Sequence, residues 1–198
     1  MPKTVWKGGA VLAPVPTALV TCADGGRVNV LTVAWTGIIN STPPKTYVSI
    51  RPERYSYDII KKSGAFVINL TPKSLVRAAD WCGVKSGRDF DKFKEMSLEH
   101  EPSPDFGIPM LCGCPVSIEC RIFDTVSLGS HDMFMADIVS VCVDEQYIDP
   151  KGKLRLDKAD IVAYSHGSYY TIGSYLGDFG FSVMKRKTAK RKQAQKHK

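Results

Sequence analysis

The sequence predicts one domain that is mainly β, a barrel of strands with a few short helices. The chain of 198 residues fits one domain, and no segment rich in Pro, Gly or Ser divides it. Most of its apolar runs are short and rich in Val, Ile and Thr, which is typical of strands. The helical patterns are few and do not alternate regularly with strands, as they do in folds built on a parallel sheet.

The first part of the chain is expected to form strands separated by turns. We expect these strands at 17–22, 28–39 and 46–51. Asp24-Gly25-Gly26 ends the first strand, and Gly37 marks a bend or bulge inside the second. Pro43-Pro44 separates the second strand from the third because proline has no N–H to donate to a sheet.

A helix is expected at 56–64. Ser56 is placed to cap its N-terminus, and Asp58 suits the positive end of the helix dipole. Gly64 suits the C-terminal stop, where the backbone often turns left-handed. The other expected elements are a strand at 65–70, a helix from Thr71-Pro72 to Gly83, a helical turn at 89–96, and strands at 115–126, 133–143 and 160–164.

The net charge of +7 is concentrated at the C-terminus. Eight Lys and Arg residues fall at 185–198 with no acidic residue among them, so residues 1–184 carry a net charge of −1. We therefore expect a folded domain at 1–184 and a basic tail at 185–198 that is solvated and disordered. The tail leaves open another class of function, a non-catalytic protein that docks nucleic acid or an acidic partner. Specific nucleic-acid binding is not favoured, because the charge lies outside the domain.

The six cysteines are expected to be reduced thiols, most of them buried. They form no C-x-x-C pair, and Cys112-Gly113-Cys114 alone is a weak signal for a metal or redox site. The N-terminus lacks the apolar core of a signal peptide, and no apolar run is long enough to span a bilayer. We therefore expect a cytoplasmic protein without disulfides, metal or membrane span.

The segment 49–56 carries residue types that bind a phosphate group. Ser49 and Arg51 lie two residues apart on an expected strand and therefore share one face. Arg54 follows, and Ser56 lies where the expected helix begins, so its hydroxyl and the next N–H groups form an anion site. The residue types alone fit the phosphate of FMN and a solvated strand end with an ordinary serine cap equally well.

The segment 29–37 is a candidate wall for a flat ring such as that of a flavin. Its backbone is able to hydrogen-bond the ring edge, where charge builds up on reduction, and Asn29 and Trp35 are close by. On spacing alone, Trp35 fits a buried core aromatic better than a flavin neighbour. The sequence contains no G-x-G-x-x-G and no P-loop, so a nucleotide site of either kind is not expected.

Several motifs, taken in order, resemble a known family. They are Asn-Val-x-Thr-x-Ala-Trp-x-Gly from Asn29, Ser-x-Arg-Pro-x-Arg-Tyr-Ser from Ser49, Asp-Trp-Cys-Gly from Asp80, Ser-Gly-Arg-Asp-Phe-Asp-Lys-Phe from Ser86, Leu-Gly-Ser-His-Asp-Met-Phe from Leu128 and Tyr-Tyr-Thr-Ile-Gly from Tyr169. Over about residues 10–180 the chain resembles the flavin reductase-like family and is similar to its flavoredoxin-containing branch. The resemblance implies an FMN-binding split β-barrel, a six-stranded barrel of Greek-key type.

The resemblance also implies site residues. It implies that Ser49, Arg51, Arg54 and Ser56 hold the phosphate region of FMN, and that Lys92 reaches the cofactor. It implies that Asn29, Thr32, Trp35, Thr36, Asn40 and Ser41 lie along the flavin. His131 and Tyr164 are implied to flank the ring or the nicotinamide pocket. His131 is the candidate catalytic residue, although the cofactor itself carries the hydride chemistry.

The function implied by the resemblance is that of an FMN-dependent oxidoreductase and homodimer. Electrons pass from NAD(P)H, or from a protein donor, through FMN to free flavin, a metal complex or a partner protein. The alternative within redox chemistry is a flavoredoxin-like carrier with little NAD(P)H activity. The alternative of another class is the binding protein that uses its basic tail.

Overall fold

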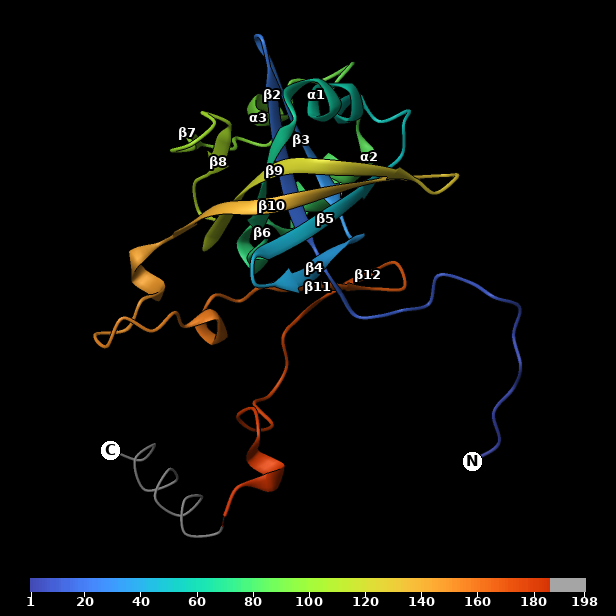
Figure 1. Ribbon diagram of the computed structural model, residues 1–198, viewed down its shortest axis with the longest axis vertical. Coiled ribbons are helices and arrows are strands. Elements are labelled where there is room, and N and C mark those ends of the chain that lie inside the picture. Colours follow the sequence, from blue (N-terminus) through green and yellow to red (C-terminus); the bar gives the residue numbers. More distant parts are fainter. Residues whose placement is uncertain (186–198) are drawn as a thin grey trace.

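The computed structural model describes residues 1–185, and all but the first residue of the expected basic tail, 186–198, lies outside the described residues. The described chain is mainly β, with short helices, as the sequence predicts. No helix among the described residues is long and apolar enough to cross a membrane. Figure 1 shows one layered barrel, and the first residues and the described segment after β12 extend away from it on the same side.

The main sheet has seven strands in the order β3-β2-β6-β9-β10-β5-β4, and each paired neighbour is antiparallel. The strands are β2 (Ala18–Asp24), β3 (Arg27–Val33), β4 (Thr36–Ser41), β5 (Pro44–Ile50), β6 (Ala65–Leu70), β9 (Val116–Ser127) and β10 (Asp132–Val143). Ser49 N donates to Trp35 O at 2.9 Å, which joins β5 to the corner between β3 and β4. This bond brings the sheet round on itself, so β3 lies beside the far end of the sheet.

The main sheet has seven strands because the expected strand at 28–39 forms two, β3 and β4. The chain bends at Ala34 and Trp35, not at Gly37, and β4 then pairs with β5. A strand that turns a barrel corner needs such a bend. The bend leaves Trp35 37% exposed.

Helix α1 (Tyr55–Ser63) closes one end of the barrel (Figure 1). Tyr57, Ile59 and Ile60 pack into the barrel core with Phe66 and Phe134. Gly64 ends the helix in the left-handed region at φ 70°, and its N–H donates to Ile60 O, as expected.

The prediction that Ser56 caps α1 is wrong. The helix begins one residue before Ser56, with Arg54 as the extended N-cap residue and no side chain in the capping position. Ser56 is instead 1% exposed inside the first turn, where it accepts a hydrogen bond from Asn29. The first N–H groups of α1 are therefore left to a partner other than a capping side chain.

Helix α2 (Val76–Val84) covers the outer face of β2 and β3. Its residues Ala79 and Cys82 form a second apolar cluster with Leu19 and Val30. It follows a short 3-10 turn, η1 (Lys73–Leu75), and continues one residue past the expected stop at Gly83. Gly83 packs against Thr32, which a Cβ would approach to 3.3 Å. Gly83 therefore brings α2 close to β3.

The remaining elements flank the barrel. Helix α3 (Lys92–Glu95) is capped by Asp91, whose carboxylate accepts from Phe93 N and Lys94 N. Strands β7 (His100–Pro102) and β8 (Pro109–Leu111) form a hairpin, while β1 (Val15–Pro16), β11 (Val162–Ser165) and β12 (Ser168–Thr171) form a small sheet. The 3-10 turns are η2 (Glu145–Tyr147), η3 (Leu156–Lys158) and η4 (Phe181–Val183).

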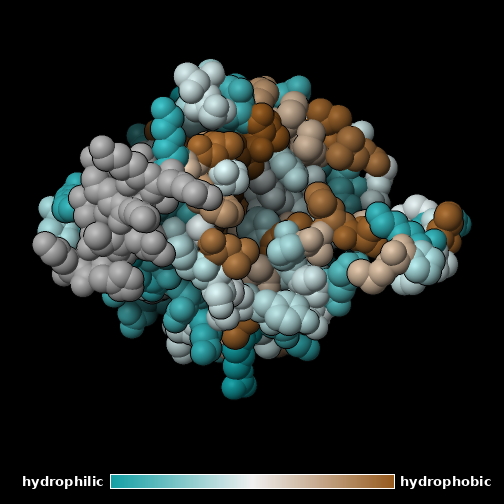
Figure 2. All heavy atoms as spheres, turned by 90° about the horizontal axis from the view of Figure 1, so that it is seen from below, coloured by the Kyte–Doolittle hydropathy of each residue, from teal (hydrophilic) through white to brown (hydrophobic). Residues whose placement is uncertain are grey.

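Strands β4, β11 and β12 lie on the lower side of the barrel in Figure 1. Figure 2 views this face and shows apolar patches around a hollowed centre. Exposed apolar residues include Trp6 and Leu12 near the N-terminus, Ile38 on β4, and Leu176 and Phe179 near the C-terminus.

Candidate functional site

Three hollows lie along β3, and Thr32 lines all of them. The cationic hollow, about 300 Å³, is lined by Asn29, Arg54, Ser56, Lys85, Arg88 and Lys92. The central hollow, about 210 Å³, is lined by Trp35, Ser49, Arg51, Arg54 and His131. The aromatic hollow, about 340 Å³, is lined by Thr17, Trp35, Asp80, Val84, Tyr164 and Tyr169. Because the hollows share residues, together they form one elongated groove.

The start of α1 supplies one wall of the cationic hollow. Asn29 Nδ2 donates to Ser56 Oγ at 2.7 Å and ties β3 to the first turn of the helix. Both residues are buried, with exposed fractions of 3% and 1%. The uncapped N-terminus carries partial positive charge and unpaired N–H groups, so this wall suits an anion.

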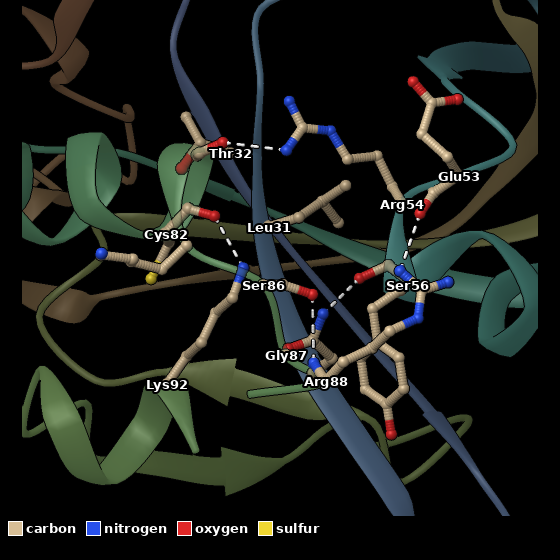
Figure 3. A pocket seen from close by; sticks show the side chains of 14 residues that line it. Leu31, Thr32, Glu53, Arg54, Ser56, Cys82, Ser86, Gly87, Arg88 and Lys92 are labelled. Atoms are coloured by element: carbon tan, nitrogen blue, oxygen red, sulfur yellow. Dashed lines mark hydrogen bonds between the residues drawn. The ribbon is translucent and has the colours of Figure 1, made fainter. Parts of the chain in front are cut away.

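Arg54 and Arg88 hold the rim of the cationic hollow (Figure 3). Arg54 Nη1 donates to Gly83 O at 3.2 Å, which links the start of α1 to α2. Arg88 Nη1 donates to Glu53 O at 2.8 Å, and its guanidinium lies 5.8 Å from the centre of the Tyr55 ring. Two guanidinium groups therefore hold the end of α2 and the loop after it to the start of α1.

Gly87 is the residue of this loop that packs closely against the lining of the hollow. A Cβ at Gly87 would collide with the side chains of Asn29 and Tyr55. The contact is too close for any other residue without movement, so the loop reaches its position because residue 87 has no side chain.

Lys92 is a buried ammonium at the base of the cationic hollow. Its side chain is 4% exposed, and Nζ donates to Cys82 O at 2.7 Å (Figure 3). Burial lowers the pKa of Lys92 to about 8. Burial also raises the pKa of Cys82 to about 11 and that of Cys22 to about 12, so these neighbouring thiols stay neutral.

Lys92 therefore has donors to spare and no counter-charge in place. No carboxylate among the described residues forms an ion pair with it. An ammonium has three N–H donors, and a buried charge is costly unless it is paired. A bound anion, such as a phosphate monoester, fits this site because it would supply both the charge and the acceptors.

The central hollow is open and mixes an aromatic face with polar groups. Trp35, 37% exposed, forms part of the wall and is not the core aromatic that spacing alone favours. Arg51 pairs with Glu53 at 3.6 Å across exposed side chains. Burial, with a further contribution from Arg51, lowers the pKa of His131, so its imidazole is neutral at pH 7.

The aromatic hollow is built by the small sheet and α2. The rings of Tyr164 and Tyr169 meet edge to face with centroids 5.5 Å apart. Tyr169 Oη donates to Asp80 Oδ1 at 3.1 Å. Burial, together with that carboxylate, raises the pKa of Tyr169 to about 12, so the phenol stays protonated.

Most of the residues that the sequence analysis singles out meet in this groove. The groove contains Asn29, Thr32, Trp35, Ser49, Arg51, Arg54, Ser56, Lys92, His131 and Tyr164. Thr36, Asn40 and Ser41 line none of the three hollows. Thr36 is buried and its hydroxyl donates to Tyr47 O, while Asn40 Nδ2 donates to Pro43 O at 2.7 Å on exposed backbone. The bend at Ala34 and Trp35 directs β4 away from the groove.

Sequence reasoning missed residues of α2, of the loop after it and of β12. Arg88, Gly87, Lys85, Asp80 and Tyr169 all line the groove, yet none was assigned a role. A signal existed for some of them, since Ser86-Gly87-Arg88 and Asp80-Trp81-Cys82-Gly83 are among the matched motifs. Their place beside β3 depends on how α2 packs, which spacing along the chain does not reveal.

Comparisons with known proteins show the family and the fold of this chain. A profile of the family described as "Flavin reductase like domain" matches residues 11–173. The structure of flavoredoxin from Desulfovibrio vulgaris (Miyazaki F) is similar with a TM-score of 0.85 and 30% identity, covering 92% of this chain and 100% of that one. An FMN-binding protein from Thermus thermophilus has a TM-score of 0.76 and 25% identity, covering 90% of this chain and 99% of that one. These similarities confirm the split-barrel fold predicted from the sequence.

For some curated relatives, the match to this chain covers only part of the relative's length. A protein named "NADPH-flavin oxidoreductase" from Streptomyces viridifaciens is 26% identical over 131 residues, which are 64% of this chain and 65% of that protein. A protein from Aeropyrum pernix is 34% identical over 132 residues, which are 66% of this chain. This chain spans half the length of that relative, because the match covers 50% of it.

Proposed function

Because this chain belongs to the flavin reductase-like family, we propose that it binds FMN along the groove beside β3 and works as a flavin-dependent oxidoreductase. Electrons would pass from NAD(P)H, or from a protein donor, through the flavin to free flavin, a metal complex or a partner protein. When bound, FMN supplies the hydride and electron chemistry. The protein supplies binding, orientation and charge balance.

The observation that carries this proposal is the buried, unpaired ammonium of Lys92 beside the uncapped start of α1. A phosphate dianion placed there would meet Lys92, the N–H groups of α1 and the guanidinium of Arg54. The phosphate chemistry fits the residues present, since each of them offers donors and the nearby thiols are neutral.

The central hollow suits the ring system. Trp35 offers a flat apolar wall, and the backbone of β3 near Thr32 offers hydrogen bonds to a ring edge. His131 would flank the ring as a neutral imidazole, able to orient a ligand without adding charge. Tyr164 borders the adjoining aromatic hollow, where a second ring would approach.

The visible absorption spectrum of the purified protein tests the proposal. We expect flavin bands that survive gel filtration, or FMN uptake on titration that quenches flavin fluorescence. Lys92→Met is the test variant, because it keeps the length of the side chain and removes its charge. It should bind FMN more weakly than the wild-type protein. A colourless protein that takes up no FMN would contradict the proposal.

A carrier role is the second candidate, and the 30% identity and TM-score of 0.85 to a flavoredoxin favour it. Stopped-flow mixing of the FMN-loaded protein with NADH and with NADPH separates the two roles. Rapid bleaching of the flavin by either nucleotide supports the reductase. Bleaching only by a reduced partner protein supports the carrier.

We also propose a homodimer located in the cytoplasm. Exposed apolar residues, such as Ile38 on β4 and Leu176 and Phe179 near the C-terminus, support a second copy of the chain that covers them. Figure 2 shows apolar patches on the face seen from below. Six free cysteines, four of them buried, support a reducing compartment. Light scattering measures the dimer, and a monomeric mass at micromolar concentration would contradict it. The alternative role, in which the basic tail docks nucleic acid or an acidic partner, falls on residues outside those that the structure describes.

A further inference from the structure

Asp132 is the first residue of β10 and follows His131 directly in the chain. Tyr57 Oη donates a hydrogen bond to Asp132 Oδ2, and Ser127 Oγ donates to Asp132 Oδ1 at 2.8 Å. One carboxylate oxygen is therefore held from α1 and the other from the end of β9. The bond from Tyr57, with a further contribution from Ser127, lowers the pKa of Asp132, so the carboxylate is ionised at neutral pH.

Tyr57 lies in the first turn of α1 and is a well-fixed donor for this bond. It is buried, and its ring packs against Phe134 with centroids 5.3 Å apart. Asp132 and Phe134 lie two residues apart on β10 and share one face of the strand, so one tyrosine contacts both. The bond to Asp132 raises the pKa of Tyr57, so its hydroxyl keeps its proton at neutral pH.

His131 lies on the opposite side of the chain and lines the central hollow. This placement follows from the alternation of side chains along a strand, because the neighbouring Asp132 faces α1. Ser130 Oγ lies 2.9 Å from His131 Nδ1, which leaves Nε2 as the ring nitrogen that a ligand would meet. Asp132 and His131 thus link α1 and the groove through two adjacent residues.

The turn between β9 and β10 is positioned from its ends. Leu128 N donates to His131 O at 2.9 Å and closes the turn. Within the described part of the chain, the hydrogen bonds recorded for Leu128, Ser130 and His131 join these residues only to one another. Asp132, at the end of the turn, supplies a side-chain link to a helix.

We propose that Tyr57 and Asp132 are positioning residues, whose hydrogen bond fixes His131 at the central hollow relative to the phosphate-binding start of α1. The bond thereby couples the anion end of the groove to its ring end. Its consequence for FMN rests on the proposed function, because the flavin ring must lie in the central hollow.

Asp132 acts through position and not through its charge. The charged groups that affect the pKa of His131 are Arg51, Glu53 and Arg54, and Asp132 is not one of them. A substitution of Asp132 that keeps a hydrogen-bond acceptor should therefore keep its effect on His131, even when the charge is lost.

Tyr57→Phe in the apoprotein is the first test, because it removes the hydroxyl and keeps the ring that packs on Phe134. Released from α1, the turn should open more often, so the Leu128 amide should exchange with deuterium about fivefold or more faster than in the wild type. Burial lowers the pKa of His131 from its ordinary 6.5, with Arg51 contributing next. This pKa, followed by NMR of the imidazole protons, should rise toward 6.5 in Tyr57→Phe.

Variants of Asp132 assign the effect to the bond. Asp132→Asn keeps an oxygen that accepts from Tyr57 Oη, so Leu128 exchange should stay within about twofold of wild type. Asp132→Leu has no acceptor and should behave like Tyr57→Phe. The double variant of Tyr57→Phe and Asp132→Leu should open the turn no further than either single variant, because both remove the same interaction.

Ile60→Val is the control for general weakening of α1. Ile60 is buried in the barrel core, and losing one methyl group lowers Tm without removing the bond between Tyr57 and Asp132. The exchange of the Leu128 amide and the pKa of His131 should stay close to wild type in this variant. Changes as large as those of Tyr57→Phe would show that helix packing, and not the hydrogen bond, holds the turn.

The FMN-loaded protein tests the consequence for the cofactor. In Tyr57→Phe, FMN affinity should stay within about threefold of wild type, because Lys92 and Arg54 are unchanged. The visible circular dichroism of the bound flavin, which reports the surroundings of its ring, should differ from that of the wild type. An unchanged flavin signal, or unchanged Leu128 exchange and His131 pKa in Tyr57→Phe, would overturn the inference.

Failure of the proposed function gives a different result. A wild-type protein that takes up no FMN contradicts the proposed function, whereas the exchange and NMR measurements on the apoprotein still decide whether the bond positions His131. If FMN binds and Tyr57→Phe changes neither the turn nor the flavin signal, only the present inference fails.

Discussion

Lys92 Nζ lies 2.7 Å from the carbonyl oxygen of Cys82, and this is the one hydrogen bond recorded for that ammonium within the described residues. The pairing holds a positive charge at the base of the groove before any ligand arrives. Burying this charge destabilises the apoprotein, and the penalty is relieved only when an anion binds. Stability of the apoprotein and affinity for the cofactor are therefore expected to oppose each other at this residue.

Replacing Lys92 with Met should reveal this opposition. FMN affinity should fall about 10- to 100-fold, because a charge-assisted contact to phosphate contributes about 1.5–3 kcal/mol. The apoprotein should be at least as stable, with Tm higher by about 2–4 °C for each kcal/mol of desolvation relieved. Fluorescence titration with FMN and calorimetry of the apoprotein measure the two effects. A variant that loses both stability and affinity would indicate that Lys92 is structural.

The pH dependence of FMN binding should follow Lys92. Its pKa in the folded apoprotein is about 8, and a bound phosphate raises it, so binding takes up a proton above pH 8. The Kd should be nearly constant between about pH 7 and about pH 8 and should then rise by up to about tenfold per pH unit. In Lys92→Met the rise should disappear. The same slope in both proteins would mean that another group controls the affinity.

The stability of the apoprotein should change with pH in the direction opposite to the affinity for FMN. The folded pKa of about 8 lies below the ordinary value of 10.5, so the unfolded chain binds more protons between these two values. The free energy of unfolding contributed by Lys92 therefore rises with pH across that window and is constant below it. Urea unfolding of wild-type and Lys92→Met apoprotein at about pH 7.5 and about pH 9.5 isolates the contribution. The difference between the two proteins should shrink at the higher pH.

Much of the fold could be predicted because local patterns decide it. The strand at 17–22, the strand at 65–70 and the stop at Gly64 follow from residue type and turn chemistry, and the structure confirms them. The error at Ser56 has a physical reason. A buried serine that accepts a hydrogen bond from Asn29, distant in sequence, has the same local signature as a capping serine.

The site could be predicted in part, where motifs lie on β3 and α1. Asn29, Arg54 and Ser56 meet at the cationic hollow because both elements border the same end of the barrel. Arg88 and Tyr169 could not be placed, since their positions depend on α2 and on the small sheet packing against β3. Thr36 lies outside the groove for a similar reason, because the bend at Ala34 and Trp35 changes the direction of the strand that follows.

Gly87 tests whether the loop after α2 has to press on Asn29. Gly87→Ala introduces a Cβ that collides with the side chains of Asn29 and Tyr55, so the loop must shift. Such overpacking costs about 1–3 kcal/mol, and we expect FMN affinity to fall by about tenfold together with a lower Tm. Gly173→Ala is the control, because a Cβ there meets no atom within 4 Å and its φ is not in the left-handed region. Normal FMN binding by Gly87→Ala would show that the loop is free to move.

Arg54 should contribute more to FMN binding than Arg51. Arg54 lines both the cationic and the central hollow and points its guanidinium at Gly83 O, whereas Arg51 lines only the central hollow. Both side chains are exposed, but Arg51 is already paired with Glu53, so that carboxylate weakens its attraction for phosphate.

Paired titrations of Arg54→Ala and Arg51→Ala with FMN compare the two residues. We expect Arg54→Ala to weaken binding by about 10-fold or more, and Arg51→Ala to weaken it by less than about fivefold. Glu53→Gln is a further control. It should strengthen the contribution of Arg51, because it removes the competing carboxylate without changing the side-chain length. A larger loss of FMN affinity for Arg51→Ala than for Arg54→Ala would indicate that the phosphate lies in the central hollow rather than the cationic hollow. The cofactor would then have a different orientation along β3.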